Sequence, residues 1–239
     1  MLKVTAIKCE VFRANASLVE YVIRHVSDLE RKILVVTSKI VSLAEKQKAP
    51  AETDKTLLIK TEADLYLGEL GYGCHLTIKH NLLMISAGID QSNSEDGNYL
   101  LLPKNPFESA KNLHATLKRH FGLKEFGVLI TDSRTSPLRA GVLGCGLACF
   151  GFKPIENRIG ESDLFGRKLK MTQLSLIDAV AVSAVMMMGE SNEQTPLAIV
   201  EGAPVTYTED TLESDLHFEM SEDLYYPMYR DLISKKETP

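Results

Sequence analysis

The chain has 239 residues, a mass of 26.5 kDa, a formal net charge of -5 and a pI near 5.7. That length suffices to bury a sizeable core in one large domain or two small ones. No basic cluster gathers on one predicted face, which argues against a nucleic-acid partner but leaves a small anionic ligand compatible with the charge. The chain starts with a charged segment instead of an apolar signal region, and its longest apolar run, residues 179–188, is too short for a bilayer. We therefore expect a cytoplasmic protein without membrane contact.

The four cysteines and six histidines lack the spacing of a redox pair or a metal site. Cys145 and Cys149 stand one residue too far apart for a redox motif, and His75 and His80 flank a predicted turn. We expect buried free thiols and structural or surface histidines.

The first elements are a predicted amphipathic helix and a buried strand. Ser17 and Glu20 have capping-box spacing, and apolar residues recur at helical period as far as Leu29, which predicts a helix over residues 18–29. The apolar run at residues 33–37 predicts the buried strand.

Two predicted strands of the first half end in residues that suit ligand binding. The first runs through Ser38 and Lys39 into a second helix, which places free amides and a cation where a phosphate would bind. An ordinary helix N-cap accounts for the same residues equally well. Strands are also predicted at residues 76–78 and 82–85, and the second of these runs into Asp90.

The central feature of the second half is residues 126–152. Its apolar residues 126–130 predict a strand that is buried on both faces and ends in Thr131, Asp132 and Ser133, before a polar segment and a glycine-rich return. A buried strand that ends in a carboxylate and hydroxyls is typical of an active site. A buried charge is costly unless it pairs with an opposite charge, a metal or a phosphate. An Asp that caps a turn is the simpler interpretation of this stretch alone.

Two predicted helices flank this stretch. Asn105 as N-cap, with Pro at the first helical position and Gly122 as the stop, predicts the first helix. The second, over residues 172–188, is apolar on nearly all sides, so we expect it to be buried all round and to end at Gly189. Glu190 then opposes the helix macrodipole, and it is either solvated or faces a metal.

No common nucleotide-binding loop is present. Residues 160–168 have one residue too many and an Arg where a Walker A loop requires Lys, and residues 144–149 lack the third glycine of a dinucleotide loop. Hard oxygen donors remain on separate segments, among them Asp90, Asp132, Ser133 and Glu190, although composition alone does not choose these four. Such donors suit Mg²⁺ or Mn²⁺, which complete their coordination with water and substrate phosphates.

Five motifs follow one another along the chain: Ala-Gly-Ile-Asp-Gln-Ser-Asn at 87–93, Leu-Leu-Pro at 101–103, Ile-Thr-Asp-Ser at 130–133, Asp-Leu-Phe-Gly-Arg at 163–167 and Met-Gly-Glu at 188–190. Together they resemble the coenzyme F420-0:L-glutamate (gamma-glutamyl) ligase family, and the similarity runs in order from Leu34 to Val200. The resemblance implies an α+β fold of mixed strands and helices, as a single domain over residues 1–239 built from two interlocked subdomains.

The resemblance also implies an activity. Members of this family use GTP and divalent metals, Mg²⁺ or Mn²⁺ with two ions per site, to join L-glutamate to a carboxylate of a cofactor-like acceptor through an acyl phosphate. It implies a homodimer with the site near the interface. By this resemblance Asp90 and Asp132 hold one metal, and Ser133 and Glu190 contact a second. The nucleotide is contacted by Asn93 and by a segment that includes Met188, Gly189, Ser191 and Asn192.

Cations are needed for the phosphates and carboxylates of such a reaction. Ser38 and Lys39 are our candidates at the nucleotide phosphates, and Arg139, Arg158 or Arg167 would hold a carboxylate of glutamate or of the acceptor by bidentate pairing. For each Arg taken singly, a structural salt bridge is the simpler interpretation.

The sequence departs from the family pattern at two places. Leu43 stands where the family commonly has a lysine in the first nucleotide loop, and Lys39 or Lys46 would have to substitute for it. Thr135 and Ser136 replace a Gly-Arg pair, a variant that resembles a bacterial branch labelled as gamma-glutamate ligases of folate metabolism. The sequence therefore does not decide whether the acceptor is a deazaflavin precursor, a folate or another carboxylate. A non-catalytic nucleotide- or metal-binding relative and a metal-dependent phosphohydrolase are the alternative functions.

Overall fold

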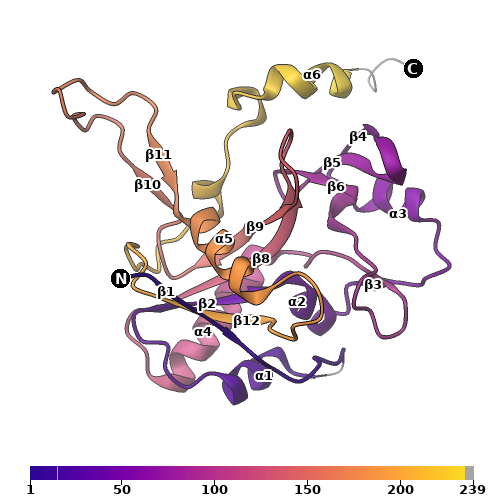
Figure 1. Ribbon diagram of the computed structural model, residues 1–239, viewed down its shortest axis with the longest axis horizontal. Coiled ribbons are helices and arrows are strands. Elements are labelled where there is room, and N and C mark those ends of the chain that lie inside the picture. The colour runs from indigo at the N-terminus through magenta and orange to yellow at the C-terminus, as the bar shows by residue number, and fades with distance from the viewer. Residues whose placement is uncertain (15, 235–239) are drawn as a thin grey trace.

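The computed structural model describes residues 1–14 and 16–234, and its centre is a five-stranded mixed sheet (Figure 1). Across the sheet the order is β1 (Lys3–Ile7), β12 (Leu197–Glu201), β2 (Lys32–Thr37), β8 (Gly127–Thr135) and β9 (Val142–Phe150). β2 and β8 run parallel, and the other neighbours are antiparallel. With helices and mixed sheets in one chain, the predicted α+β class is confirmed.

Helices cover both faces of this sheet, which explains why β2 and β8 are apolar at every position of their buried halves. On one face, Leu34 and Val128 share a core with α1 (Leu18–His25), α2 (Ser38–Ala44) and α4 (Pro106–Phe121). On the other face, Ile33 and Leu129 pack against α5 (Leu176–Met188). Alternate side chains of one strand therefore enter different cores.

A smaller antiparallel sheet stands beside the main one (Figure 1). It consists of β4 (Leu65–Glu69), β5 (His75–Lys79) and β6 (Leu82–Ile85), preceded by α3 (Lys55–Glu62). The two-residue strands β3 (Lys48–Ala49) and β7 (Tyr99–Leu100) pair with each other. Near the end of the chain, α6 (Tyr226–Ser234) packs on the small sheet, where Tyr229 joins Leu67 and Ile78. The short 3₁₀ turns are η1 (Gly71–Gly73), η2 (Ser86–Gly88), η3 (Glu213–Leu216) and η4 (Met220–Glu222).

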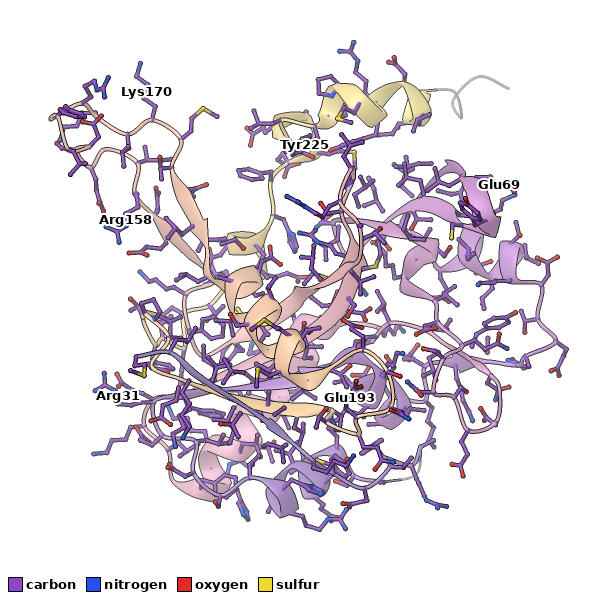
Figure 2. The ribbon with its side chains drawn as sticks, viewed as in Figure 1. Arg31, Glu69, Arg158, Lys170, Glu193 and Tyr225 are labelled. Carbon is purple, nitrogen blue, oxygen red and sulfur yellow. The ribbon has the colours of Figure 1, made fainter. Side chains whose placement is uncertain are left out.

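A projecting arm, residues 155–175, extends from the body of the molecule (Figures 1 and 2). Its base is the pair of β10 (Ile155–Asn157) and β11 (Gln173–Ser175). Leu164 and Phe165 are 98% and 82% exposed, which is far more than large apolar side chains normally show. The arm therefore carries apolar surface that residues 1–14 and 16–234 leave uncovered.

Three of the predicted boundaries are wrong. The helix predicted over residues 18–29 ends at His25, and the apolar residues that follow it are buried outside the helix. The central strand does not end at Thr131 but continues as β8 to Thr135, paired throughout with β9. The polar residues of its second half face a cavity instead of the core, so the change from apolar to polar residues marked a change of surroundings and not a strand end.

The helix predicted over residues 172–188 begins at Leu176, because the hydroxyl of Ser175 accepts a hydrogen bond from the backbone N–H of Asp178 and caps it. The prediction that this helix is buried all round is also wrong. Val182, Met186 and Met187 are exposed on its outer face. Within the described residues, we found no helix with the length and apolar character that a membrane span requires.

Candidate functional site

A cavity of about 1190 Å³ lies among α2, the small sheet, the second half of β8 and residues 188–196. In Figure 2, Glu193 marks the last of these segments. Most of the predicted site residues line this cavity. The exceptions are Ser38, which is buried, Arg139, which is exposed on the turn between β8 and β9, and Arg158 and Arg167. Segments that are far apart in the sequence thus supply one wall each.

The charged centre of the cavity is built around Lys39. Its Nζ lies 2.6 Å from Oδ2 of Asp90 and donates a hydrogen bond to Oγ of Ser92 at 2.8 Å. Oγ of Ser92 in turn donates to Oδ2 of Asp90 at 2.6 Å. Asp132 interacts electrostatically with both Lys39 and Asp90. One ammonium group therefore serves two carboxylates, and whether Lys39 also contacts a phosphate stays a prediction.

The two carboxylates differ in their pKa values because their surroundings differ. Desolvation opposes the charged form of Asp90, but hydrogen bonds from Lys39 and Ser92 outweigh it and lower the pKa of Asp90 to about 2. At Asp132, by contrast, desolvation is the larger effect and raises the pKa to about 6, although hydrogen bonds from the Ser133 backbone and the Ser38 hydroxyl lower it in part. Titratable neighbours that are shifted in opposite directions are typical of functional sites.

Ser133 and Glu190 form a second polar pair in the cavity. The Ser133 hydroxyl donates to Oε1 of Glu190 at 2.7 Å. Asp132 and Ser133 point to opposite faces of β8, so Asp132 meets α2 while Ser133 meets the end of α5. The amide of Asn93 donates to the carbonyl of Ser191 at 3.0 Å and ties the Asp90 loop to residues 188–196.

A left-handed turn delivers Asp90 to the cavity. The three residues of η2 have φ values of 51° at Ser86, 53° at Ala87 and 70° at Gly88. For residues other than glycine this conformation costs about 1–2 kcal/mol each. Thr77 holds the turn, because its hydroxyl accepts from the Ala87 N–H at 2.9 Å and donates to the Met84 carbonyl at 2.8 Å.

We expect Thr77→Val to reduce the free energy of unfolding by about 1–3 kcal/mol, because it leaves a buried amide without an acceptor. Thr77→Ser keeps the hydroxyl and should cost about 1 kcal/mol, the contribution of one buried methyl group. Urea denaturation of both variants measures the difference. Thr61→Val, at an exposed position on α3, is the matched control. Equal losses for the Val and Ser variants at Thr77 would show that its hydroxyl does not hold the turn.

The donors of the cavity have the chemistry that a hard divalent ion requires, with carboxylate oxygens of Asp90 and Asp132 on one side and a hydroxyl beside a carboxylate on the other. No group of three or more His, Cys, Asp or Glu side chains gathers closely enough to hold a metal anywhere in residues 1–14 and 16–234. Ions at this site would therefore need substrate phosphates and water to complete their coordination, which is the usual manner for Mg²⁺.

The arginines are placed differently from the sequence prediction. Arg158 pairs with Glu156 at 2.6 Å and Arg167 with Asp163 at 2.9 Å, both on the projecting arm. For these two the structure shows the salt bridge that was the simpler interpretation. The cavity is instead lined by two arginines that the sequence analysis did not select, Arg13 and Arg134. The position of Arg134 two residues after Asp132 in a strand was the available signal, because such residues share a face.

The prediction of buried free thiols is confirmed for three of the four cysteines and is wrong for Cys74, which lines the cavity. All four lie within the described residues as free thiols, and only Cys74 is not buried. Cys145 is directly opposite Asp132 in the β8 and β9 register. Burial raises the pKa of the Cys145 thiol to about 12, so this group is neutral and unreactive beside the site.

Comparison with known proteins assigns a family to this fold and site. The sequence pattern of the F420-0:gamma-glutamyl ligase family matches residues 47–202. A coenzyme F420:L-glutamate ligase of Methanococcus maripaludis is 34% identical over 190 residues, which is 78% of this chain and 75% of that protein. The coenzyme F420:L-glutamate ligase of Methanosarcina acetivorans is 29% identical over 245 residues, which is 95% of this chain and 93% of that protein. The chain belongs to the F420-0:gamma-glutamyl ligase family.

Proposed function

We propose that this protein is a GTP-dependent ligase that joins L-glutamate to a carboxylate of an F420-type acceptor. The relatives are named coenzyme F420:L-glutamate ligases. The observation that carries the proposal is the gathering of Asp90, Asp132, Ser133 and Glu190 around one cavity in a chain of this family. At about 1190 Å³, the cavity exceeds the space that a single drug-sized ligand requires, so it suits several substrates together.

The reaction needs activation, because a carboxylate does not condense with an amine in water. In the proposed sequence an acceptor carboxylate oxygen attacks the γ-phosphorus of GTP, which releases GDP and forms an acyl phosphate. The glutamate amine then attacks the acyl carbon, phosphate leaves and a proton is lost from nitrogen. Asp90 and Asp132 would hold one Mg²⁺ or Mn²⁺ ion, and Ser133 and Glu190 would contact a second. When bound, these ions would neutralise charge on the phosphates.

Residues 188–195 are the proposed contact for the nucleotide. The segment closes on itself, since the Ser191 N–H donates to Oε2 of Glu193 at 2.8 Å and the Thr195 hydroxyl donates to the Met188 carbonyl. Gly189 has a φ of 81°, and a Cβ there would lie 2.4 Å from the Glu193 side chain. This compact loop supports a fixed binding surface that includes Ser191 and Asn192.

A homodimer is the proposed assembly. Apolar side chains that are exposed on the outer face of α5 and at the tip of the projecting arm support it, because soluble proteins usually cover patches of this kind.

One observation favours a second candidate, a non-catalytic relative. Leu43 lines the cavity, so the position where the family commonly has a lysine lies at the proposed substrate site. Lys39 is already engaged with Asp90 at 2.6 Å. A nucleotide site that lacks one cation would bind phosphates more weakly.

The proposal is tested by mass spectrometry of reactions that contain GTP, Mg²⁺ or Mn²⁺, L-glutamate and a panel of acceptors. The panel holds the deazaflavin precursor F420-0, folate and a small hydroxy acid. We expect one acceptor to gain a glutamyl group with one GDP and one phosphate released per bond, and no product when glutamate is omitted. Phosphate release that does not depend on glutamate would instead identify a phosphohydrolase. The absence of any turnover would favour the non-catalytic relative.

A further inference from the structure

The walls of the cavity carry more acids than cations. Among the described residues, six carboxylates line it, whereas the cations that do so are Arg13, Lys39 and Arg134. A ligand with several phosphates would be repelled by this surplus of negative charge unless metal ions and free cations offset it. The cations that have no ion pair therefore decide where phosphates can bind.

Neither lysine that was predicted to replace the cation missing at Leu43 stands free in the cavity. Lys39 already pairs with Asp90 at 2.6 Å. Lys46 is exposed and does not line the cavity. The two arginines of the cavity remain, and within the described part of the chain neither of them forms an ion pair.

Of these two arginines, Arg13 belongs to a segment that is joined to the proposed nucleotide segment. Residues 10–13 and residues 188–196 line the same cavity. The N–H of Cys9, four residues before Arg13, donates to the Gln194 carbonyl at 2.9 Å and links the two segments. Arg134 instead lies within β8, in the hairpin with β9.

The backbone at Arg13 is held in place although its side chain is exposed. Phe12 is buried, and its ring meets the Tyr21 ring of α1 edge-on with the centroids 5.0 Å apart. The Tyr21 hydroxyl donates to the Glu10 carbonyl at 2.6 Å. On the other side, the Ala16 N–H donates to the Arg13 carbonyl at 2.8 Å. A fixed attachment reduces the entropy that is lost when the side chain binds a ligand.

The carboxylate nearest to Arg13 in the sequence is occupied elsewhere. Oε2 of Glu10 lies 2.6 Å from Nε2 of His25, and Oε1 of Glu10 lies 3.4 Å from the guanidinium of Arg24. Both partners belong to α1. Glu10 therefore does not neutralise Arg13, whose charge is left for a ligand in the cavity.

We propose that Arg13 binds the phosphates of the nucleotide and supplies the cation that position 43 lacks. Leu43 and Arg13 line the same cavity, and α1, which follows Arg13, packs against α2, which carries Leu43. A guanidinium suits this role because it remains charged and pairs with two phosphate oxygens at once. That the phosphates belong to a nucleotide rests on the proposed function.

Calorimetric titration with GTP and Mg²⁺, without acceptor or glutamate, measures this contact. We expect Arg13→Gln to weaken GTP binding about 10- to 100-fold, the usual cost of a lost hydrogen bond to a charged group. Arg13→Lys keeps the charge but not the paired geometry, and its affinity should lie between the two. Arg119→Gln, at an exposed position on α4 outside the cavity, is the control and should bind GTP as the parent does.

A lysine at position 43 distinguishes a phosphate contact from a structural effect. Leu43→Lys should restore most of the GTP affinity of the Arg13→Gln protein and add little to the parent, because both cations would serve the same phosphates. Equal GTP affinity in the parent and Arg13→Gln proteins would overturn the inference. A loss in Arg134→Gln without a loss in Arg13→Gln would also overturn it and assign the role to Arg134.

The same titrations separate this inference from the proposed function. GTP binding that depends on Arg13, without ligation of any acceptor, would support the inference and contradict the proposed function alone. Ligation by a parent protein whose GTP affinity Arg13→Gln leaves unchanged would contradict the inference alone. A parent protein that does not bind GTP would overturn both.

Discussion

Asp132→Asn is expected to lower glutamate-dependent GTP turnover by at least about 100-fold while the protein remains folded. Loss of groups that merely support a metal ligand costs about 10- to 100-fold in affinity or activity, so loss of a ligand should cost more. Asn is neutral and nearly equal in volume, so it removes the charge without opening a hole. Steady-state GDP release over a range of Mg²⁺ concentrations measures the loss, which excess metal should not restore.

The stability of Asp132→Asn provides the control for folding. At pH 7 the native protein carries this carboxylate ionised, because that pH lies above its pKa of about 6, and desolvation disfavours the charge. The variant should therefore melt at the same temperature as the parent or higher, as is common where function costs stability. Asp210→Asn, at an exposed position near the end of the chain, should change neither property. A turnover rate equal to the parent's would rule out the role of Asp132.

The elements with strong local signals were predictable from the sequence. Asn105, Pro106 and Gly122 mark the ends of α4, and the structure places those ends at the predicted residues. The hairpin of β5 and β6 likewise follows from two apolar runs around a short polar turn. These features depend on the chain's own backbone preferences, which a single sequence displays.

Features that depend on distant partners were not predictable in the same way. The outer face of α5 is apolar but exposed, and composition cannot distinguish a residue buried in its own chain from one left for a partner. β8 continues to Thr135 because β9 pairs with it, although its residues become polar. Arg139 was predicted to bind a carboxylate, whereas Arg134 of β8 lines the cavity, because the pairing with β9 extends the strand past Asp132.

The sequence predicted which residues belong to the candidate site, but not how they are grouped in space. Resemblance to a family selected Asp90, Asp132, Ser133 and Glu190, and the structure places all four around one cavity. Their division into a pair around Lys39 and a separate pair across β8 required the fold. The roles of these residues in binding metals and nucleotide stay predictions, which substitutions at each pair can test independently.

Glu190→Gln separates a ligase from a relative that has lost activity. Glu190 follows the C-terminal end of α5, where a negative charge opposes the helix macrodipole by about 0.3–1 kcal/mol, and its one hydrogen bond from Ser133 needs only an acceptor oxygen. Without ligands the variant should therefore be as stable as the parent or slightly more stable. With GTP and Mg²⁺ at about 100 times their dissociation constants, the parent should gain about 2.7 kcal/mol, or about 5–10 °C in melting temperature.

Glu190→Gln should lose most of that increment if Glu190 contacts a metal that bridges to the nucleotide, together with glutamate-dependent GDP release. Differential scanning fluorimetry with and without GTP and Mg²⁺ measures this increment as a shift in melting temperature. Glu69→Gln, at an exposed position on β4 (Figure 2), is the control and should keep the full shift. An undiminished shift in Glu190→Gln would exclude this metal contact. A parent protein that shows a shift but no turnover would identify a non-catalytic nucleotide-binding relative, because a native state that binds the nucleotide and its metal must be stabilised by them. The absence of both a shift and turnover would count against GTP binding altogether.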